Sequence, residues 1–91
     1  MKGKDRATLR AEAHHLDPAV HIGGQGINDA LVASLQDVLR TRELVKVKIG
    51  KGLDLKAKEA AEVLSRRTRS EVVQVIGRTV TLYRFNPELH E

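Results

Sequence analysis

The sequence predicts an α/β domain: a two-layer sandwich with the element order αβαβαββ and a four-stranded mixed sheet. Segments with helical periodicity alternate with short β-rich runs. The last two runs are separated by only two residues, as in a hairpin. Right-handed crossovers would place both connecting helices on one face of the sheet. Since 91 residues suffice for one modest core, we expect a single domain over residues 1–86 and a short polar tail over 87–91.

The N-terminal segment is predicted to form an amphipathic helix over residues 5–15. Apolar residues from Leu9 to Leu16 recur at helical spacing, and charged residues occupy the rest of the helical wheel. Pro18 ends this helix because the residue before a proline is pushed out of the α region. A short strand over residues 19–22 follows.

A glycine-rich loop connects this strand to the clearest helix of the chain. Asn28 is a good N-cap, so the helix is expected to begin directly after the loop. Glycine can take positive φ and lets another molecule approach the backbone, and a helix start offers unpaired N–H groups to an anion. We interpret the loop as a phosphate site, although a turn that needs glycine for steric reasons alone fits the local sequence equally well. The loop residues are Gly23, Gly24, Gln25 and Gly26.

The remaining elements follow from the same two periodicities. We expect a helix over residues 29–40, a strand over 44–49, a third helix over 54–67 and two strands over 71–76 and 79–84. Glycine at the first position of the last turn suits a type II′ hairpin. The face of the sheet without connecting helices, if partly open, would show Lys46, Lys48, Gln74, Thr79, Thr81 and Tyr83.

Positive charge is concentrated in the second half of the chain. The net charge is +4 and the pI is near 9.8, which makes a polyanionic partner plausible. Alternating lysines on a strand can also act only as solubilising residues. A later arginine run can likewise be a solvated helix end that the macrodipole favours. The first cluster is Arg40, Arg42, Lys46, Lys48 and Lys51, and the later run is Arg66, Arg67 and Arg69.

Several function classes are disfavoured by composition. The chain has no cysteine, which excludes disulfides, thiolate zinc sites and thiol nucleophiles. The charged start leads into no apolar segment, so we expect a soluble, cytoplasmic protein without a signal peptide. No acid, base and nucleophile are predicted to converge, so we expect no enzyme activity, no cofactor and no metal site. His14 and His15 would diverge on a helix and are expected to pack or hydrogen-bond at the surface.

Four stretches together resemble a known family. Residues 13–16 read Ala-His-His-Leu, the glycine loop follows over 22–26, residues 43–48 read Glu-Leu-Val-Lys-Val-Lys, and 73–84 form the closing hairpin. In this order they resemble the CRM domain (chloroplast RNA splicing and ribosome maturation), in particular its bacterial stand-alone members of the YhbY type. The resemblance covers nearly the whole chain. Family members often carry lysine in the loop, where this chain has Gly24 and Gln25.

The resemblance implies RNA binding, association with precursors of the large ribosomal subunit, and a fold similar to the C-terminal domain of the third translation initiation factor. We therefore expect a non-catalytic, monomeric protein that clamps the backbone of ribosomal RNA with its glycine loop, as the KH module does with its own GXXG loop. The alternative is a small adaptor that binds ribosomal or assembly proteins through its sheet face. The expected RNA-binding residues are Gly23, Gly24, Gln25, Gly26, Lys46, Lys48, Arg78, Lys51 and Arg10.

Overall fold

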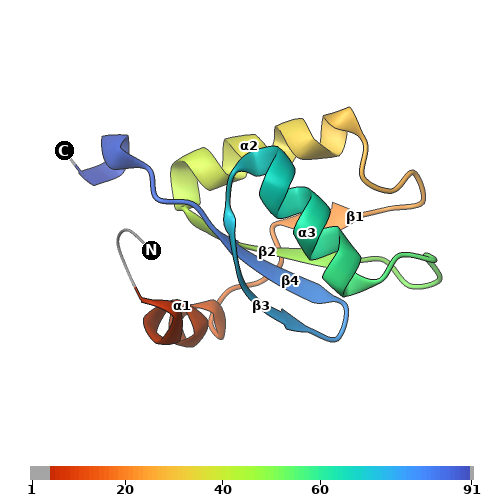
Figure 1. The fold of residues 1–91 in the computed structure, drawn as a ribbon, viewed down its shortest axis with the longest axis horizontal. Coiled ribbons are helices and arrows are strands. Elements are labelled where there is room, and N and C mark those ends of the chain that lie inside the picture. The colour runs from red at the N-terminus through yellow and green to blue at the C-terminus, as the bar shows by residue number, and fades with distance from the viewer. Residues whose placement is uncertain (1–4, 91) are drawn as a thin grey trace.

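The computed structural model describes residues 5–90 and confirms the predicted order of elements (Figure 1). No helix in this range is long and apolar enough to cross a membrane. A 3-10 turn, η1, follows β4 and stacks His90 on Phe85 with ring centroids 4.7 Å apart. The domain boundary at residue 86 stays a prediction. The elements are α1 (Arg6–Ala13), β1 (Val20–Ile22), α2 (Asp29–Arg42), β2 (Leu44–Ile49), α3 (Ala57–Thr68), β3 (Glu71–Ile76), β4 (Thr79–Tyr83) and η1 (Pro87–His90).

The four strands form one mixed sheet in the order β1-β2-β4-β3. β1 runs parallel to β2, whereas β4 is antiparallel to both of its neighbours, β2 and β3. β1, β2 and β3 therefore point the same way, and their carboxyl ends lie at one end of the sheet. Figure 1 shows the loops after β1 and β2 projecting together at this end, with α1 toward the other.

α2 and α3 cover one face of the sheet, as predicted. The alternation of β2 turns Val45, Val47 and Ile49 toward these helices, and all three are at most 1% exposed. They join Leu35 and Leu39 of α2 and Ala60, Ala61 and Leu64 of α3 in the main core cluster. Val20 and Ile22 anchor β1 in the same cluster, so the glycine loop starts from a fixed strand.

α1 lies on the opposite face of the sheet and covers part of it. Leu9 packs with Val73 and Tyr83 in a second core cluster. The expectation that Tyr83 and Thr81 would show on an open face is therefore wrong, because Tyr83 is 4% exposed and Thr81 is 1% exposed. The rest of this face stays open, and Lys48 and Ile76 are exposed on it.

Three helix boundaries differ from the prediction by two residues or more, and one is the end of α2, at Arg42 and not at residue 40. α1 ends at Ala13, and Leu16 lies beyond it with 36% of its surface exposed. α3 begins at Ala57 and not at residue 54. Leu53, Leu55 and Ala57 all pack against the main core, and the chain turns and bends between Lys51 and Asp54 before the helix starts.

Candidate functional site

The glycine loop has two kinds of glycine. Gly26 has a φ of 69°, and its N–H donates to the Gly23 carbonyl over 2.9 Å, so a turn with positive φ requires glycine here. Gly23 and Gly24 have no such φ, and a Cβ built on either would meet no atom within 4 Å. The packing of residues 5–90 therefore gives no reason for glycine at positions 23 and 24, whereas a ligand close to the backbone would.

The first turn of α2, which follows this loop, has backbone N–H groups that are free to donate. The N-cap prediction is confirmed: the Asn28 side chain accepts the N–H of Leu31 over 2.8 Å. Gln25 is held against the cap, because its Oε1 accepts from the Asn28 side chain over 3.3 Å. The N–H groups of Asp29 and Ala30 have no partner within residues 5–90. These amides point along the positive end of the helix dipole, an arrangement that favours an anion.

The carboxylate of Asp29 would oppose an anion at the helix start. It is paired instead with Arg67 of α3 over 2.7 Å. Both groups are well exposed, so the pair contributes little stability, but it offsets the negative charge beside the loop. Arg66 of the same run donates to the Glu62 carbonyl of its own helix over 3.4 Å. Two of the three arginines in this run are thus engaged within the protein.

Two further turns meet the glycine loop at the carboxyl end of the sheet. The Gly50 N–H donates to the Ile22 carbonyl over 3.0 Å, and a Cβ on Gly50 would sit 3.0 Å from that same oxygen. This close approach joins the β2 turn to the end of β1. Lys51 in the β2 turn is exposed, as is Asp54 in the same loop.

Arg78 closes this end from the hairpin turn. Its N–H groups donate to the carbonyls of Ile49, over 3.2 Å, and Gly50, while the Ile49 N–H donates to the Arg78 carbonyl over 2.8 Å. The turn has positive φ at Gly77 and not at Arg78, the pattern of a type II′ hairpin. We call the three turns together the glycine-loop end. It comprises residues 23–26, 50–52 and 77–78.

The two lysines of β2 that were predicted to bind RNA differ in exposure and in hydrogen bonding. Lys48 is exposed and lies in register between His21 of β1 and Thr79 of β4. Lys46 is half-buried, and its Nζ donates to the Leu16 carbonyl over 3.2 Å. His21 is exposed beside Lys48 and was missed as a candidate, although the apolar-polar alternation of Val20, His21 and Ile22 could have placed it there.

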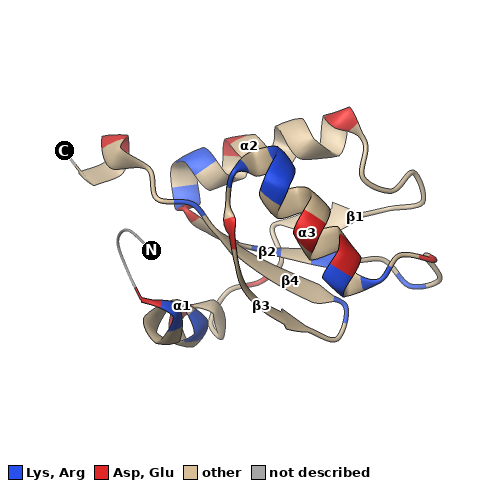
Figure 2. Ribbon diagram, viewed as in Figure 1, with Lys and Arg blue, Asp and Glu red and all other residues tan. Residues whose placement is uncertain are grey.

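Like Lys46, Arg10 is a predicted residue that the structure does not bring to the glycine-loop end. It lies in the last turn of α1, toward the other end of the molecule (Figure 1). Figure 2 shows that Lys and Arg occur at both ends of the fold, including α1, the C-terminal turns of α2 and α3, and the loop after β2. The described residues contain no group of three or more His, Asp or Glu that could hold a metal ion.

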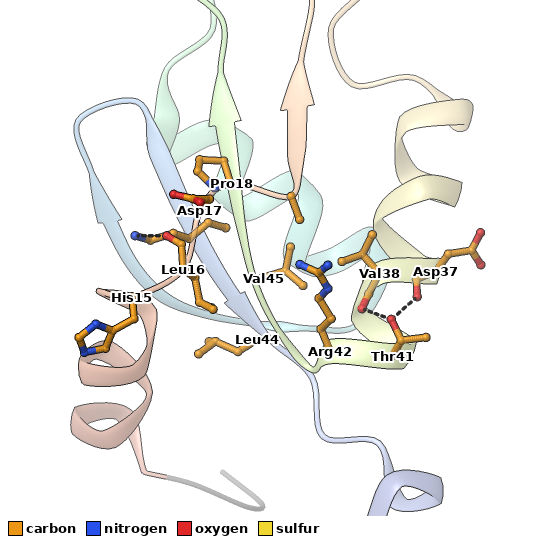
Figure 3. Close-up of a pocket in the computed structure, with 12 residues that line it drawn as sticks. His15, Leu16, Asp17, Pro18, Asp37, Val38, Thr41, Arg42, Leu44 and Val45 are labelled. Atoms are coloured by element: carbon orange, nitrogen blue, oxygen red, sulfur yellow. Dashed lines mark hydrogen bonds between the residues drawn. The ribbon is translucent and has the colours of Figure 1, made fainter.

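A larger cleft lies at the opposite end of the sheet. This amino-end groove, of about 640 Å³, is bounded by residues 15–19, the C-terminal part of α2 and the first residues of β2. Figure 3 shows Arg42 reaching from the end of α2 past Val38 and Val45. Among the predicted site residues only Lys46 lines this groove.

The fold and the glycine-loop end define a class: small α/β domains that offer helix-start amides and nearby cations to an anionic ligand. The chain belongs to the family described as the CRS1 / YhbY (CRM) domain, which matches residues 1–84. The family resemblance inferred from the four sequence stretches is thereby confirmed.

Relatives from other organisms span nearly the full chain. The probable RNA-binding protein YqeI of Bacillus subtilis is 36% identical over 88 residues, covering 97% of this chain and 92% of the relative. An RNA-binding protein of Haemophilus influenzae is 36% identical over 89 residues, covering 97% and 89%. The solution structure of SAV1595 from Staphylococcus aureus, described as a candidate RNA-binding protein, superimposes with a TM-score of 0.79 at 43% identity and covers 94% of this chain and 90% of that one.

Proposed function

We propose that this chain is a non-catalytic RNA-binding protein that holds RNA backbone at the glycine-loop end. The observation that most supports this proposal concerns Gly23 and Gly24. Both have ordinary φ, and the space where a side chain would be is open. They let a phosphate approach the free amides that start α2. Exposed cations at Lys48, Lys51 and Arg78 supply the long-range attraction. The names of the relatives support RNA as the ligand.

We further propose ribosomal RNA in precursors of the large subunit as the target, with the chain acting as a cytoplasmic monomer. This narrower assignment rests on the family resemblance. Crosslinking the protein to RNA in cells and sequencing the bound fragments tests it. Enrichment of large-subunit rRNA over messenger RNA is the expected result, and an even spread over transcripts would contradict it.

The RNA-binding proposal is tested by a titration of purified protein with a ribosomal RNA fragment at several salt concentrations. Each phosphate contact releases counterions, so log K should fall linearly with log salt. The phosphate contacts proposed here predict a slope of about −2 to −4, counting the loop and three cations. A complex whose affinity ignores salt, or the absence of any complex, would contradict the proposal and favour the adaptor function.

A further inference from the structure

The open part of the sheet face holds a shallow pocket that backbone binding leaves unexplained. It measures about 140 Å³ and lies between the end of α1 and the middle of β2, β4 and β3. Strand pairing places Thr81 between Lys46 on one side and Gln74 on the other. No lining residue is acidic. The six are His14, Lys46, Gln74, Ile76, Thr79 and Thr81.

Thr81 presents an unpartnered polar atom to this pocket. The residue is 1% exposed, and its hydroxyl makes no hydrogen bond within residues 5–90. Every side-chain nitrogen or oxygen in that range that is sealed from solvent has a partner, so the Thr81 hydroxyl must reach the pocket and not the core. A buried hydroxyl is normally satisfied. Here its partner has to come from outside the protein.

The wall of the pocket adds two complementary features. The Gln74 amide, which offers both donors and an acceptor, also has no partner within the described chain. Ile76 is 59% exposed although it lies on a strand, and it gives the pocket one apolar side. An exposed large apolar residue beside unpartnered polar groups suits a ligand with a flat apolar face and a hydrogen-bonding edge.

An unpaired nucleobase has these two properties, and RNA-binding modules commonly receive unstacked bases and hydrogen-bond their edges. The volume narrows the choice further. An enclosed cavity of about 150 Å³ holds one benzene ring, so a pocket of about 140 Å³ has room for a single six-membered ring, and a fused purine would project beyond it. The ligand class that fits is therefore a pyrimidine.

The pocket is also within reach of the glycine-loop end. Lys48 pairs in register with His21 of β1 and with Thr79 at the pocket wall, and the glycine loop begins directly after Ile22. Neighbouring strands are about 4.8 Å apart, so β1 and β3 are separated by about 14 Å. A short extended strand of RNA can cross this distance over Lys48.

We propose that the pocket at Thr81 receives an unpaired pyrimidine base from an RNA strand whose phosphates lie on the glycine-loop end. This inference rests on the proposed RNA-binding function and adds base selection to it. Gln74 and Thr81 hydrogen-bond the edge of the base, and Ile76 packs on its face.

The test uses the full chain with three twelve-nucleotide RNAs: one of uridine alone, one of adenosine alone, and one with an abasic site at every position. Fluorescence anisotropy at fixed salt should give uridine an affinity about 3- to 10-fold above the abasic strand, which corresponds to one or two hydrogen bonds. Adenosine should bind no better than the abasic strand. Equal affinity for uridine and adenosine, or for uridine and the abasic strand, would overturn the base pocket.

Thr81→Val is the matched variant. It keeps the shape of the side chain and removes only an unpartnered hydroxyl, so its melting temperature should equal or exceed that of the wild type. Its uridine affinity should drop toward the abasic value, and Thr81→Ser should restore it. If Thr81→Val kept its preference for uridine, the base pocket would be rejected. If the wild type bound none of the three RNAs, the proposed RNA-binding function itself would be rejected instead.

Discussion

The two ends of the sheet differ in their electrostatics, although one helix, α2, runs between them. α2 points its N-terminus at the glycine-loop end and its C-terminus at the amino-end groove. At the first end the helix dipole and free amides favour an anion. At the second, Arg40 is paired with Asp37 over 2.7 Å, and the Thr41 hydroxyl is shared between the carbonyls of Asp37 and Val38. Three of the polar side chains that line the groove, those of Asp37, Thr41 and Lys46, are engaged within the protein.

The site proposed at the glycine-loop end therefore does not coincide with the groove. The groove is the larger cleft, at about 640 Å³, yet the negative end of the helix dipole lies beside it. The glycine-loop end is not a deep cavity, but it combines free helix-start amides with exposed cations. If RNA binding is governed by these charges and amides, changes at the loop should matter and equal changes at the groove should not.

Gly24→Asp should have the largest effect on RNA binding. The new carboxylate would lie near the bound phosphate, and repulsion of about 1 to 4 kcal/mol at roughly 4 Å corresponds to a loss of affinity of about fivefold or more. The fold should be unaffected, because Gly24 lacks positive φ and a Cβ there meets nothing within 4 Å. Binding titrations beside thermal melts measure both quantities.

Two controls sharpen this comparison. Gly24→Lys makes the same backbone change with the opposite charge, so it should retain or improve RNA affinity. Arg42→Glu changes the charge of the groove by two units at an exposed residue and should alter affinity by less than about twofold because salt screens distant charges. If Arg42→Glu weakened binding as much as Gly24→Asp, the groove and not the glycine-loop end would be the place where RNA binds.

Gly26→Ala should act on stability and not on charge. Its φ of 69° is unfavourable for alanine, so unfolding free energy should fall by about 1 kcal/mol, or about 4–8 °C in melting temperature. Gly23→Ala, in the same loop without positive φ, should melt like the wild type. Equal losses in both variants would show that the whole loop is a steric turn.

Lys48→Ala should give a smaller but more specific change. A lost phosphate contact reduces the magnitude of the salt slope by about 0.7 to 0.9. Lys48 is exposed and has no hydrogen bond to lose within residues 5–90, so stability should not change. Arg42→Ala is the matched cation at the groove, and its slope should equal that of the wild type. An unchanged slope for Lys48→Ala would make this lysine a solubilising residue.

The sequence predicts most of the fold because local patterns carry it. Alternation in residues 44–49 fixed the buried face of β2, and Asn28 fixed the start of α2 to the residue. The side of the sheet on which α1 packs could not be predicted, since no local pattern encodes it. This long-range choice buried Tyr83 against expectation. Thr81, which lies between Lys46 and Gln74 in the sheet, is buried as well.

The residue types of the candidate site were predictable from the sequence. Which of these residues serve the fold and which are available to a ligand was not. The sequence shows three glycines but not which of them the turn needs. The structure shows that the turn requires glycine at Gly26 and does not require it at Gly23 or Gly24. Likewise, two alternating lysines look alike in sequence. Only the tertiary contact of Lys46 with the Leu16 carbonyl distinguishes it from Lys48.

The smallest expected effect concerns acid pH and α1, which lies away from the glycine-loop end. The pKa of Asp5 is below its usual value because its carboxylate accepts the Thr8 N–H at the helix start, over 2.8 Å. A lowered folded-state pKa stabilises α1 at pH values above the usual carboxyl range, and this contribution is lost as the pH falls below 3.8. Amide exchange should show α1 fraying first, while the amides of β2 stay protected.

Asp5→Asn is the control, since asparagine caps a helix equally well without a titrating charge. Fraying of α1 in this variant should not depend on pH in that range. The same pH dependence in Asp5→Asn would assign the effect to another group.

The central claim is tested most directly by mapping RNA contacts on the isotope-labelled chain with amide chemical shifts. A short single-stranded RNA titrated at low salt should move the amides of Gly23, Gly24, Asp29 and Lys51 and leave those of Thr41 and Arg42 in place. Shifts concentrated at the groove, with the amides of the glycine loop unmoved, would contradict the account.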